Sequence, residues 1–488
     1  MSELPAWVDP VFEAAEMRAV DAWAIEEQGV PQDDLMERAA LGLARLAAEL
    51  AAGAAPIRIV AGKGNNGGDG RVAARLLRDD GHEVELIDGT EPFDANRLAG
   101  SAVVVDALLG TGFEGAPREP VAWAIAAINA QDAPVIACDV PSGVNASTGE
   151  IEAEAVRANA TATFHGSKVG LHVEPGKGHA GRVEVVEIGI PRGAPAPSAA
   201  GLISDRVLEL YPRRERSGSK FSSGVVVVVG GSMGLTGAPT MAARSAQRAG
   251  AGYVQVAVPG PVQPTVDLRL LEQMSRGLSD DDGFHTPAGV GDVEELAERA
   301  GAVVLGPGLG RAEGAQEFAR AAAVAVEAPL LVDADGLNAH AGRLELFRER
   351  EAPTVLTPHE AELGRLLEVD AEEVAAHRVR HVRAAAERSG AVVLLKGDDT
   401  IVALPGGPLA ISRGGTPALA TAGTGDVLSG LIGALLAKRL GAFEAASMGA
   451  LAHTLAARHA AGLLGADHVM AGDVIEGLPW GLTLYGGG

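Results

Sequence analysis

Short runs of hydrophobic residues alternate along the chain with segments in which apolar and charged residues recur at helical spacing. In the first half, the apolar runs are residues 57–60, 84–87, 102–108, 134–140 and 160–164. Helical patterns occupy residues 69–81 and 118–131, between such runs. Continuous apolar runs that alternate with helices are typical of parallel strands buried on both faces. The pattern therefore predicts an α/β fold with a sheet between two layers of helices.

A break in this pattern divides the chain. Residues 190–203 concentrate Pro, Gly and Ala, and residues 211–220 are polar and basic, a composition typical of a linker. The alternation then restarts at residue 225, and the chain ends with Ala- and Leu-rich helical patterns over residues 425–440 and 442–464. We therefore expect two domains, residues 1–212 and 213–488.

Composition and charge exclude several classes of protein. The 488 residues are 47% hydrophobic and 21% charged, which is ordinary for a globular protein. A net charge of −24 without a basic stripe argues against a nucleic-acid partner. The apolar runs are too short to span a bilayer, and the first residues lack the pattern of a signal peptide, so we expect a cytoplasmic protein with no membrane contact.

A single cysteine, Cys138, rules out a disulfide within the chain and fits a cytosolic protein. A role as a nucleophile is one interpretation of Cys138. We favour the other, a small apolar residue on a buried strand.

The segment "AGKGNNGGDG", residues 61–70, follows the first apolar run. Gly62, Gly64 and Gly67 form a G-x-G-x-x-G pattern, and Asp88 follows about 20 residues later, as in a dinucleotide-binding fingerprint. A glycine-rich loop before a helix presents backbone N–H groups and a positive helix end to phosphate. An oxidoreductase would also need a place where the nicotinamide meets a second substrate, and no motif indicates one.

Polar residues inside this loop suggest another role. Asn65, Asn66 and Asp69 could bind a hard cation or sugar hydroxyls, or could serve turns and a helix cap. Other strand ends carry similar residues: Asp106 before the "GTG" of 110–112, and Asp139 with Ser142 in "DVPSG". Because ligands bind outside the carboxyl ends of strands in open α/β sheets, these segments predict one site.

The motifs "GNNGGDG", "DALLGTGFEG" and "DVPSG", in this order, resemble the YjeF N-terminal family, the NAD(P)H-hydrate epimerases. The resemblance covers about residues 10–205 and includes "MRAVDAWAIEEQGVP" and "LMERAA". It implies a Rossmann-like domain that interconverts the R- and S-hydrates of NADH and NADPH. It also implies potassium at Asn66, Asp106 and Ser142. The implied substrate contacts are Asn65, Asn66, Gly67, Gly68, Asp69, Gly110, Thr111, Gly112, Phe113, Glu114, Gly115, Ala116 and Asp139.

Epimerisation requires the bond to the hydroxyl to open and close, or a proton to move. A carboxylate near the nicotinamide ring could act as the acid or the base. Asp139 is our candidate for this role.

A second glycine-rich loop, "TAGTGDVLSG", begins the apolar helix predicted from residue 425. The backbone amides around Gly423 and Gly425 and the helix end would form an anion hole. Asp426 could deprotonate a hydroxyl that attacks a phosphoryl group, as the base does in kinases. Alternatively, Asp426 caps the helix, a contribution of about 0.5–2 kcal/mol.

This loop resembles the anion-hole signature of ribokinase-like kinases. With segments 230–252, 306–310, 332–340, 357–363 and 396–400, it resembles the YjeF C-terminal family, the nucleotide-dependent NAD(P)H-hydrate dehydratases, over about residues 215–480. The resemblance implies a three-layer ribokinase-like α/β/α domain. ADP, with magnesium neutralising its phosphates, would phosphorylate the S-hydrate, and departure of phosphate would restore NADH or NADPH, with AMP as the other product.

The resemblance also implies the site residues of this half. Asp426 would be the base. The hydrate would contact Ala238, Gly310, His359 and Asp426, and the nucleotide would contact Lys396, Gly397, Asp398, Asp399, Thr400 and Gly425.

Four positions in three motifs depart from the family pattern. Asp398 and Asp399 stand where small residues are frequent, and they would repel phosphate unless a cation intervenes or the side chains turn away. Ala361 replaces a usual Gly, and Leu235 replaces a frequent aromatic residue. These departures concern the affinity for the nucleotide.

We therefore expect a bifunctional nicotinamide nucleotide repair enzyme, an isomerase and a lyase, that forms a homo-oligomer. One alternative is a ribokinase-like vitamin kinase with a nucleotide-binding accessory N-terminal domain. Another is that the N-terminal half only binds a nucleotide or a protein partner. The choice between ADP and ATP stays open, although the two-domain fusion favours ADP.

Overall fold

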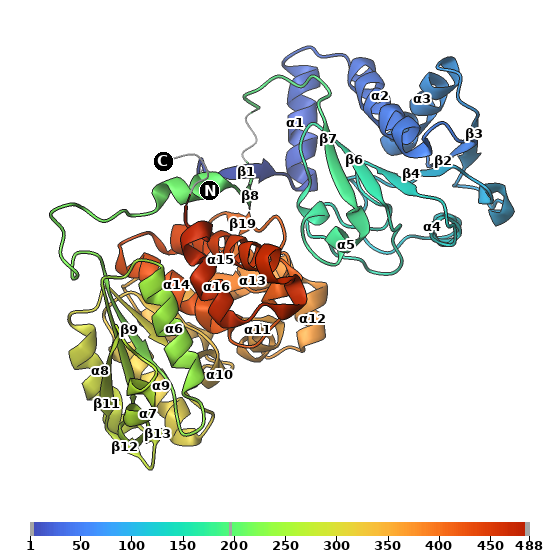
Figure 1. Cartoon of the computed structure of the whole chain (residues 1–488). Coiled ribbons are helices and arrows are strands. Elements are labelled where there is room, and N and C mark those ends of the chain that lie inside the picture. Colours follow the sequence, from blue (N-terminus) through green and yellow to red (C-terminus); the bar gives the residue numbers. More distant parts are fainter. Residues whose placement is uncertain (1–3, 195–197, 484–488) are drawn as a thin grey trace.

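A computed structural model describes residues 4–194 and 198–483 of the chain. Two parallel or mainly parallel sheets, each covered by helices, form two units (Figure 1). The short strands β1 (Val8–Val11) and β8 (Ala200–Ile203) lie between these units. This arrangement confirms the expected α/β fold.

The smaller sheet has six strands, all parallel, in the order β3-β2-β4-β5-β6-β7. Its central strand β4 is buried on both faces, as its apolar run predicts. One face packs against α2 and α3 through Ile57, Ile59 and Val105, and the other packs against α4 through Val60 and Val104. The elements are β2 (Ile57–Ala61), β3 (Val84–Asp88), β4 (Val103–Ala107), β5 (Val135–Cys138), β6 (Ala160–Phe164), β7 (Arg182–Val186), α1 (Ala14–Glu26), α2 (Gln32–Ala51), α3 (Asn65–Asp79), α4 (Val121–Asn129) and α5 (Gly176–Ala180).

The larger sheet has eleven strands, in the order β1-β8-β19-β18-β17-β16-β15-β14-β9-β10-β11. In β9, Val226 and Val228 pack with α6, α14 and α15, whereas Val227 and Val229 face α9. The strands are β9 (Val225–Val229), β10 (Tyr253–Pro259), β11 (Met274–Leu278), β14 (Ala302–Leu305), β15 (Leu330–Val332), β16 (Thr354–Leu356), β17 (Val392–Leu395), β18 (Ile401–Ala403) and β19 (Leu409–Ile411), with a separate hairpin of β12 (Asp280–Asp281) and β13 (Phe284–His285).

The helices around this sheet are α6 (Gly237–Arg248), α7 (Gln263–Asp267), α8 (Val290–Ala297), α9 (Glu313–Ala325), α10 (Asp335–Ala339), α11 (Glu360–Leu367), α12 (Ala371–Ala376), α13 (Arg378–Ser389), α14 (Thr424–Ala437), α15 (Ala442–Leu464) and α16 (Ala471–Gly481). The helix predicted over residues 442–464 has these bounds in the structure. The helix predicted from residue 425 begins at Thr424.

The segment predicted to be a linker, residues 190–203, ends in a strand. β8 pairs with β1 on one side and with β19 on the other, and all its residues are buried. At Gly201 an added Cβ would lie 2.8 Å from Cβ of Val8, so glycine lets these strands approach. The small residues of β8 thus allow close packing between strands, although the same composition is also typical of a linker. The domain division at residue 212 stays a prediction.

Two other expectations concern the chain as a whole. Cys138 is a free thiol, fully buried at the end of β5, where burial raises the pKa of its thiol. Among residues 4–194 and 198–483, no helix is both long enough and apolar enough to cross a membrane.

Candidate active sites

Most of the residues predicted to bind the hydrate in the N-terminal half converge on one cavity of about 730 Å³. The cavity lies at the carboxyl ends of β2, β4 and β5, and residues of α1 and α2 also line it. It is lined by the predicted residues Asn65, Asn66, Asp69, Gly110, Thr111, Gly112, Phe113 and Asp139. The other predicted contacts, Gly67, Gly68, Glu114, Gly115 and Ala116, are not among its lining residues, and their role in binding stays a prediction.

The glycine-rich segment is partly helical. Helix α3 begins at Asn65, so the run from Asn65 to Asp69 forms its first turn rather than a loop. A Cβ on Gly67 would lie 1.9 Å from the carbonyl oxygen of Gly62, which shows that glycine permits close packing of helix on strand. Asp88 is exposed and does not line the cavity, although it accepts hydrogen bonds from Thr90, which does. Gly67 of the apparent dinucleotide fingerprint therefore has a packing role, whereas Gly62 and Gly64 line the cavity.

Asn66, Asp106 and Ser142, the predicted potassium ligands, meet around the backbone of Leu109. Ser142 donates to the Asp106 carboxylate through its hydroxyl at 2.6 Å and its N–H at 2.8 Å. The Asn66 side-chain N–H donates to the Leu109 carbonyl at 2.8 Å. Burial raises the pKa of Asp106 to about 6 despite the bonds from Ser142. No Lys, Arg or His within the described ranges pairs with this carboxylate.

Asp139 forms a buried ion pair that the sequence did not indicate. Lys168 Nζ lies 2.5 Å from Asp139 Oδ1 and also donates to the Thr163 hydroxyl and the Phe164 carbonyl, each at 3.0 Å. The Thr111 hydroxyl donates to the other carboxylate oxygen. Burial alone would raise the pKa of Asp139, but Lys168 lowers it below its usual range. Asp139 has φ +64°, a left-handed conformation that is rare for residues other than glycine and is found at functional sites.

A second aspartate in the cavity, Asp69, has a raised rather than a lowered pKa. Burial, together with the charges of Asp139 and Asp21, raises the pKa of Asp69 to about 8. Burial also raises the pKa of Asp21, which lies on α1 and lines the same cavity. The cavity therefore holds a protonated carboxyl group beside an ionised carboxylate–lysine pair, the arrangement by which enzymes separate an acid from a base.

In the C-terminal half, Asp426 lies in the first turn of α14, after Gly423 with φ +92°. Burial and the negative charge of Asp333 raise the pKa of Asp426 to about 7, although Lys396 opposes the shift. A carboxyl group with a pKa near 7 suits a general base. Asp426 also lies where the helix end attracts anions.

Asp333, at the end of β15, pairs with Lys396 at the end of β17. Lys396 Nζ lies 2.9 Å from Asp333 and 3.5 Å from Glu362, and the Ser429 hydroxyl donates to Asp333 at 2.6 Å. Burial would raise the pKa of Asp333, but Lys396 lowers it. The resemblance placed Lys396 at the nucleotide. Asp333, Glu362 and Ser429 were not predicted as site residues, although all three lie in the motifs that carry the resemblance.

The other predicted hydrate contacts lie on neighbouring loops. His359 precedes α11, and its Nδ1 accepts from the N–H of Ala361 at 3.1 Å, while burial lowers the pKa of its imidazole. Gly310 donates its N–H to Asp335 at 3.0 Å. Ala238 lies in the first turn of α6, and a Cβ on Gly308 would be 3.3 Å from its methyl group. These contacts place the three residues at the same end of the sheet as Asp426, and their contact with a hydrate stays a prediction.

The two carboxylates that would repel a nucleotide are both paired. Asp399 is buried and lies 2.9 Å from Nε of Arg378. Asp398 forms an ion pair with Lys177, which belongs to the N-terminal half. Thr400 donates its hydroxyl to the Gly397 carbonyl at 2.7 Å and closes the turn that carries both aspartates.

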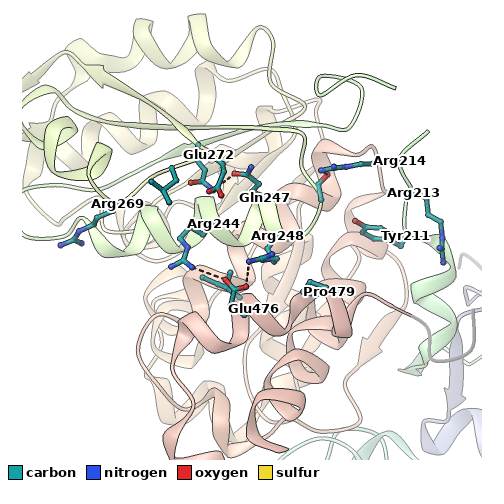
Figure 2. Close-up of a pocket in the computed structure, with 14 residues that line it drawn as sticks. Tyr211, Arg213, Arg214, Arg244, Gln247, Arg248, Arg269, Glu272, Glu476 and Pro479 are labelled. Atoms are coloured by element: carbon teal, nitrogen blue, oxygen red, sulfur yellow. Dashed lines mark hydrogen bonds and ion pairs between the residues drawn. The ribbon is translucent and has the colours of Figure 1, made fainter. Parts of the chain in front are cut away.

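A separate cavity of about 1000 Å³ contains none of the predicted site residues (Figure 2). Arg213, Arg214 and Arg269 line it, and Arg244 and Arg248 point toward Glu476, with which both form ion pairs. Arg248 ends α6, where a cation stabilises the negative end of the helix. The pairing and this position explain Arg248 without a ligand.

Comparison with known proteins identifies both halves. A family model described as NAD(P)H-hydrate dehydratase matches residues 226–479, and one described as YjeF-related protein N-terminus matches residues 32–99 and 88–170. The bifunctional NAD(P)H-hydrate repair enzyme Nnr of Salinibacter ruber is 38% identical over 458 residues, which span 83% of this chain and 84% of the relative. That of Moorella thermoacetica is 37% identical over 510 residues, or 96% and 95% of the two chains.

Among solved structures, the ADP/ATP-dependent NAD(P)H-hydrate dehydratase from Bacillus subtilis, co-crystallised with ATP/Mg²⁺, is 26% identical with a TM-score of 0.48. The match covers 57% of this chain and 95% of that one. The relatives match across both halves of the sequence, which favours a repair enzyme over a vitamin kinase or an oxidoreductase. The chain therefore belongs to the family of bifunctional NAD(P)H-hydrate repair enzymes.

Proposed function

We propose that the N-terminal half interconverts the R- and S-hydrates of NADH and NADPH, and that the C-terminal half converts the S-hydrate back to NADH or NADPH at the expense of ADP. One observation supports both activities. Each half has a protonatable aspartate, with a pKa of about 8 at Asp69 and about 7 at Asp426, beside a buried aspartate–lysine pair. Each half thus offers a group that can exchange a proton near neutral pH.

For epimerisation, Asp69 is the better acid because it is protonated at neutral pH. It would donate a proton to the departing hydroxyl of the hydrate, and the lone pair of the ring nitrogen would form the iminium cation. Water would then add to the opposite face and return the proton to Asp69. Asp139, which the sequence suggested as the acid or base, would remain ionised and hold Lys168 and Thr111 in the cavity.

For dehydration, Asp426 would accept the proton of the hydrate hydroxyl. The oxygen would attack the terminal phosphorus of ADP, and AMP would leave. The phosphate would then depart with the C–O electron pair, and loss of a ring proton would restore the reduced nicotinamide. Lys396 to Thr400 and Gly425 would hold the nucleotide, with Ala238, Gly310 and His359 at the hydrate.

Potassium and magnesium fit these sites. Asp106 is a fully buried carboxylate without a cationic partner, and the Asn66 amide oxygen accepts no hydrogen bond within residues 4–194 and 198–483. With the Ser142 hydroxyl, these oxygen atoms suit a hard cation, which would stabilise the charge of Asp106. In the C-terminal half, magnesium bound to the nucleotide would neutralise its phosphates.

We also propose that the enzyme is cytoplasmic and forms a homo-oligomer. Leu268 and Leu271, three residues apart in the chain, are 88% and 90% exposed, and they are candidates for a contact with a second copy. Light scattering at several concentrations tests this, and a monomer at every concentration would contradict it.

The activity is tested with purified R- and S-hydrates. We expect the S-hydrate to be converted to NADH, followed by its absorbance, with ADP and ATP compared in parallel. The R-hydrate alone should yield the S-hydrate without nucleotide. Failure of the S-hydrate to react with either nucleotide would refute the dehydratase assignment, and failure of the R-hydrate to epimerise would refute the other.

A further inference from the structure

One short segment connects the two candidate sites. Residues 168–177, here called the joining segment, begin at Lys168 in the N-terminal cavity. Val169 and Val173 are fully buried and pack in the apolar core of the larger sheet, with Leu409 and Ile411. The segment ends against the predicted nucleotide loop, residues 396–400. The N-terminal half is thus anchored in the core of the other half and reaches its nucleotide loop.

The nucleotide loop is fixed from inside by Arg378. This side chain is almost fully buried, pairs with Glu360 and with Asp399, and donates to the Lys396 carbonyl at 3.3 Å. A Cβ on Gly397 would lie 2.4 Å from the guanidinium, so glycine leaves room for it. From the joining segment, the N–H of Glu174 donates to Asp399 at 2.9 Å. Asp399 is thus neutralised within the C-terminal half, and from the other half it receives a backbone contact.

Asp398 depends on the other half for its counter-charge. Its carboxylate pairs with the Lys177 ammonium of the joining segment and accepts from the N–H of Gly415 at 2.8 Å. Burial would raise the pKa of Asp398, but the hydrogen bond and charge of Lys177 lower it. Arg458 lies farther away and donates to the carbonyls of Gly414 and Gly415 rather than to this carboxylate. Within residues 4–194 and 198–483, Lys177 is therefore the cation in direct contact with Asp398.

We propose that Lys177, although it lies in the epimerase half, is a positioning residue of the dehydratase reaction. By pairing with Asp398 it removes a negative charge from the loop that the phosphates of a nucleoside diphosphate approach. The inference rests on the proposed nucleotide role of residues 396–400. The N-terminal half would thus support the dehydratase reaction in addition to, and independently of, epimerisation.

The experiment uses the full chain and pure S-hydrate, so that epimerisation is bypassed. We expect Lys177→Ala to raise KM for ADP about fivefold with little change in kcat, because an unpaired Asp398 repels phosphate. Lys177→Arg should restore the KM. The matched control is Arg383→Ala, which breaks another ion pair between the halves, with Glu13 at 3.1 Å, away from the loop. An unchanged KM in Lys177→Ala, or an equal rise in Arg383→Ala, would overturn the proposal.

A double-mutant cycle tests the mechanism. If Lys177 acts through the charge of Asp398, Lys177→Ala should have no further effect on KM for ADP when combined with Asp398→Asn. A full additional rise in the double variant would show that Lys177 acts by another route and would refute the proposal. Lys396→Ala separates the two hypotheses. If Lys396→Ala leaves KM for ADP unchanged, both the nucleotide role of the loop and the positioning role of Lys177 are refuted. If Lys396→Ala raises KM while Lys177→Ala does not, only the positioning role of Lys177 is refuted.

Discussion

The two halves use the same pair of groups in different surroundings. Each has a buried aspartate that binds a lysine, Asp139 with Lys168 and Asp333 with Lys396, next to an aspartate of raised pKa. The Lys168 side chain is 2% exposed and its ammonium contacts three oxygen atoms. The Lys396 side chain is 22% exposed and is shared by two carboxylates.

This difference in exposure suggests different roles for the two lysines. Lys168 is enclosed and pairs with Asp139, so it can fix the charge state of that carboxylate. Lys396 is open enough to meet a phosphate, and its two carboxylates hold it charged: burial opposes this, but their charges raise its pKa above its usual range. We therefore expect the ion pair to act as a structural anchor in the N-terminal half and its lysine to contact the anionic nucleotide in the C-terminal half.

The comparison is tested most strongly by Asp426→Asn, which keeps the size of the side chain but removes the base. We expect kcat for the S-hydrate to fall about 10²–10⁴-fold, with R-to-S epimerisation unchanged. Stopped assays of both reactions on one protein preparation measure this. Retention of full dehydratase activity would show that Asp426 only caps the helix.

Lys168→Met tests the enclosed pair. Because it leaves the Asp139 charge buried without a partner, we expect the free energy of unfolding of the N-terminal half to fall by about 3–5 kcal/mol. Epimerisation should be lost while the C-terminal half stays active with the S-hydrate. Urea unfolding measures the stability, and the exposed residue Lys220 provides a control, Lys220→Met. Equal stability of the two variants would contradict an anchoring role.

The pH dependence of the two reactions should have opposite signs. Epimerisation needs protonated Asp69 and should decline as the pH rises through about 8, whereas dehydration needs ionised Asp426 and should increase as the pH rises through about 7. Each limb should approach a tenfold change per pH unit. Profiles of kcat from pH 5.5 to 9.5 with R-hydrate and S-hydrate provide the measurement. Parallel profiles would reject the assigned roles.

The smallest expected effect concerns potassium. Asp106→Asn removes the anionic ligand, so the potassium concentration for half-maximal epimerisation should rise about tenfold. Dehydration should not change. Titration with KCl at constant ionic strength, with NaCl as the balancing salt, measures it. If Asp106→Asn and the unmodified enzyme respond equally to potassium, the ion binds elsewhere.

Local patterns predicted the elements whose ends are marked in the sequence. The strand at residues 160–164 and the helix at 442–464 have the predicted bounds because polar or glycine residues mark their ends. The carboxyl ends of these strands also predicted the N-terminal site. The same rule would have found Lys168, which follows β6, whereas Asp21 lies on a helix and is indistinguishable in sequence from a surface residue.

Other features depend on contacts that sequence spacing does not reveal. Lys177 neutralises Asp398 from the other half of the chain, so the acidic loop looks unfavourable for a nucleotide when it is read alone. Strand β8 has only four residues and gains its stability from β1 and β19 on either side. Its Gly- and Ala-rich sequence therefore resembles a linker.

The pairing of β1 and β8 has a consequence for how this enzyme can be divided. A cut at residue 212 would leave both strands with the epimerase half and would expose β19 as a bare sheet edge on the dehydratase half. An unprotected edge strand invites pairing with other chains and aggregation. Trp7, beside β1, would also lose its contact with Phe443, whose ring centroid is 5.4 Å away. Backbone pairing between strands of the two halves therefore links the two catalytic units. A dehydratase half produced alone should need either another way to cover the edge of β19 or a grafted copy of β1 and β8.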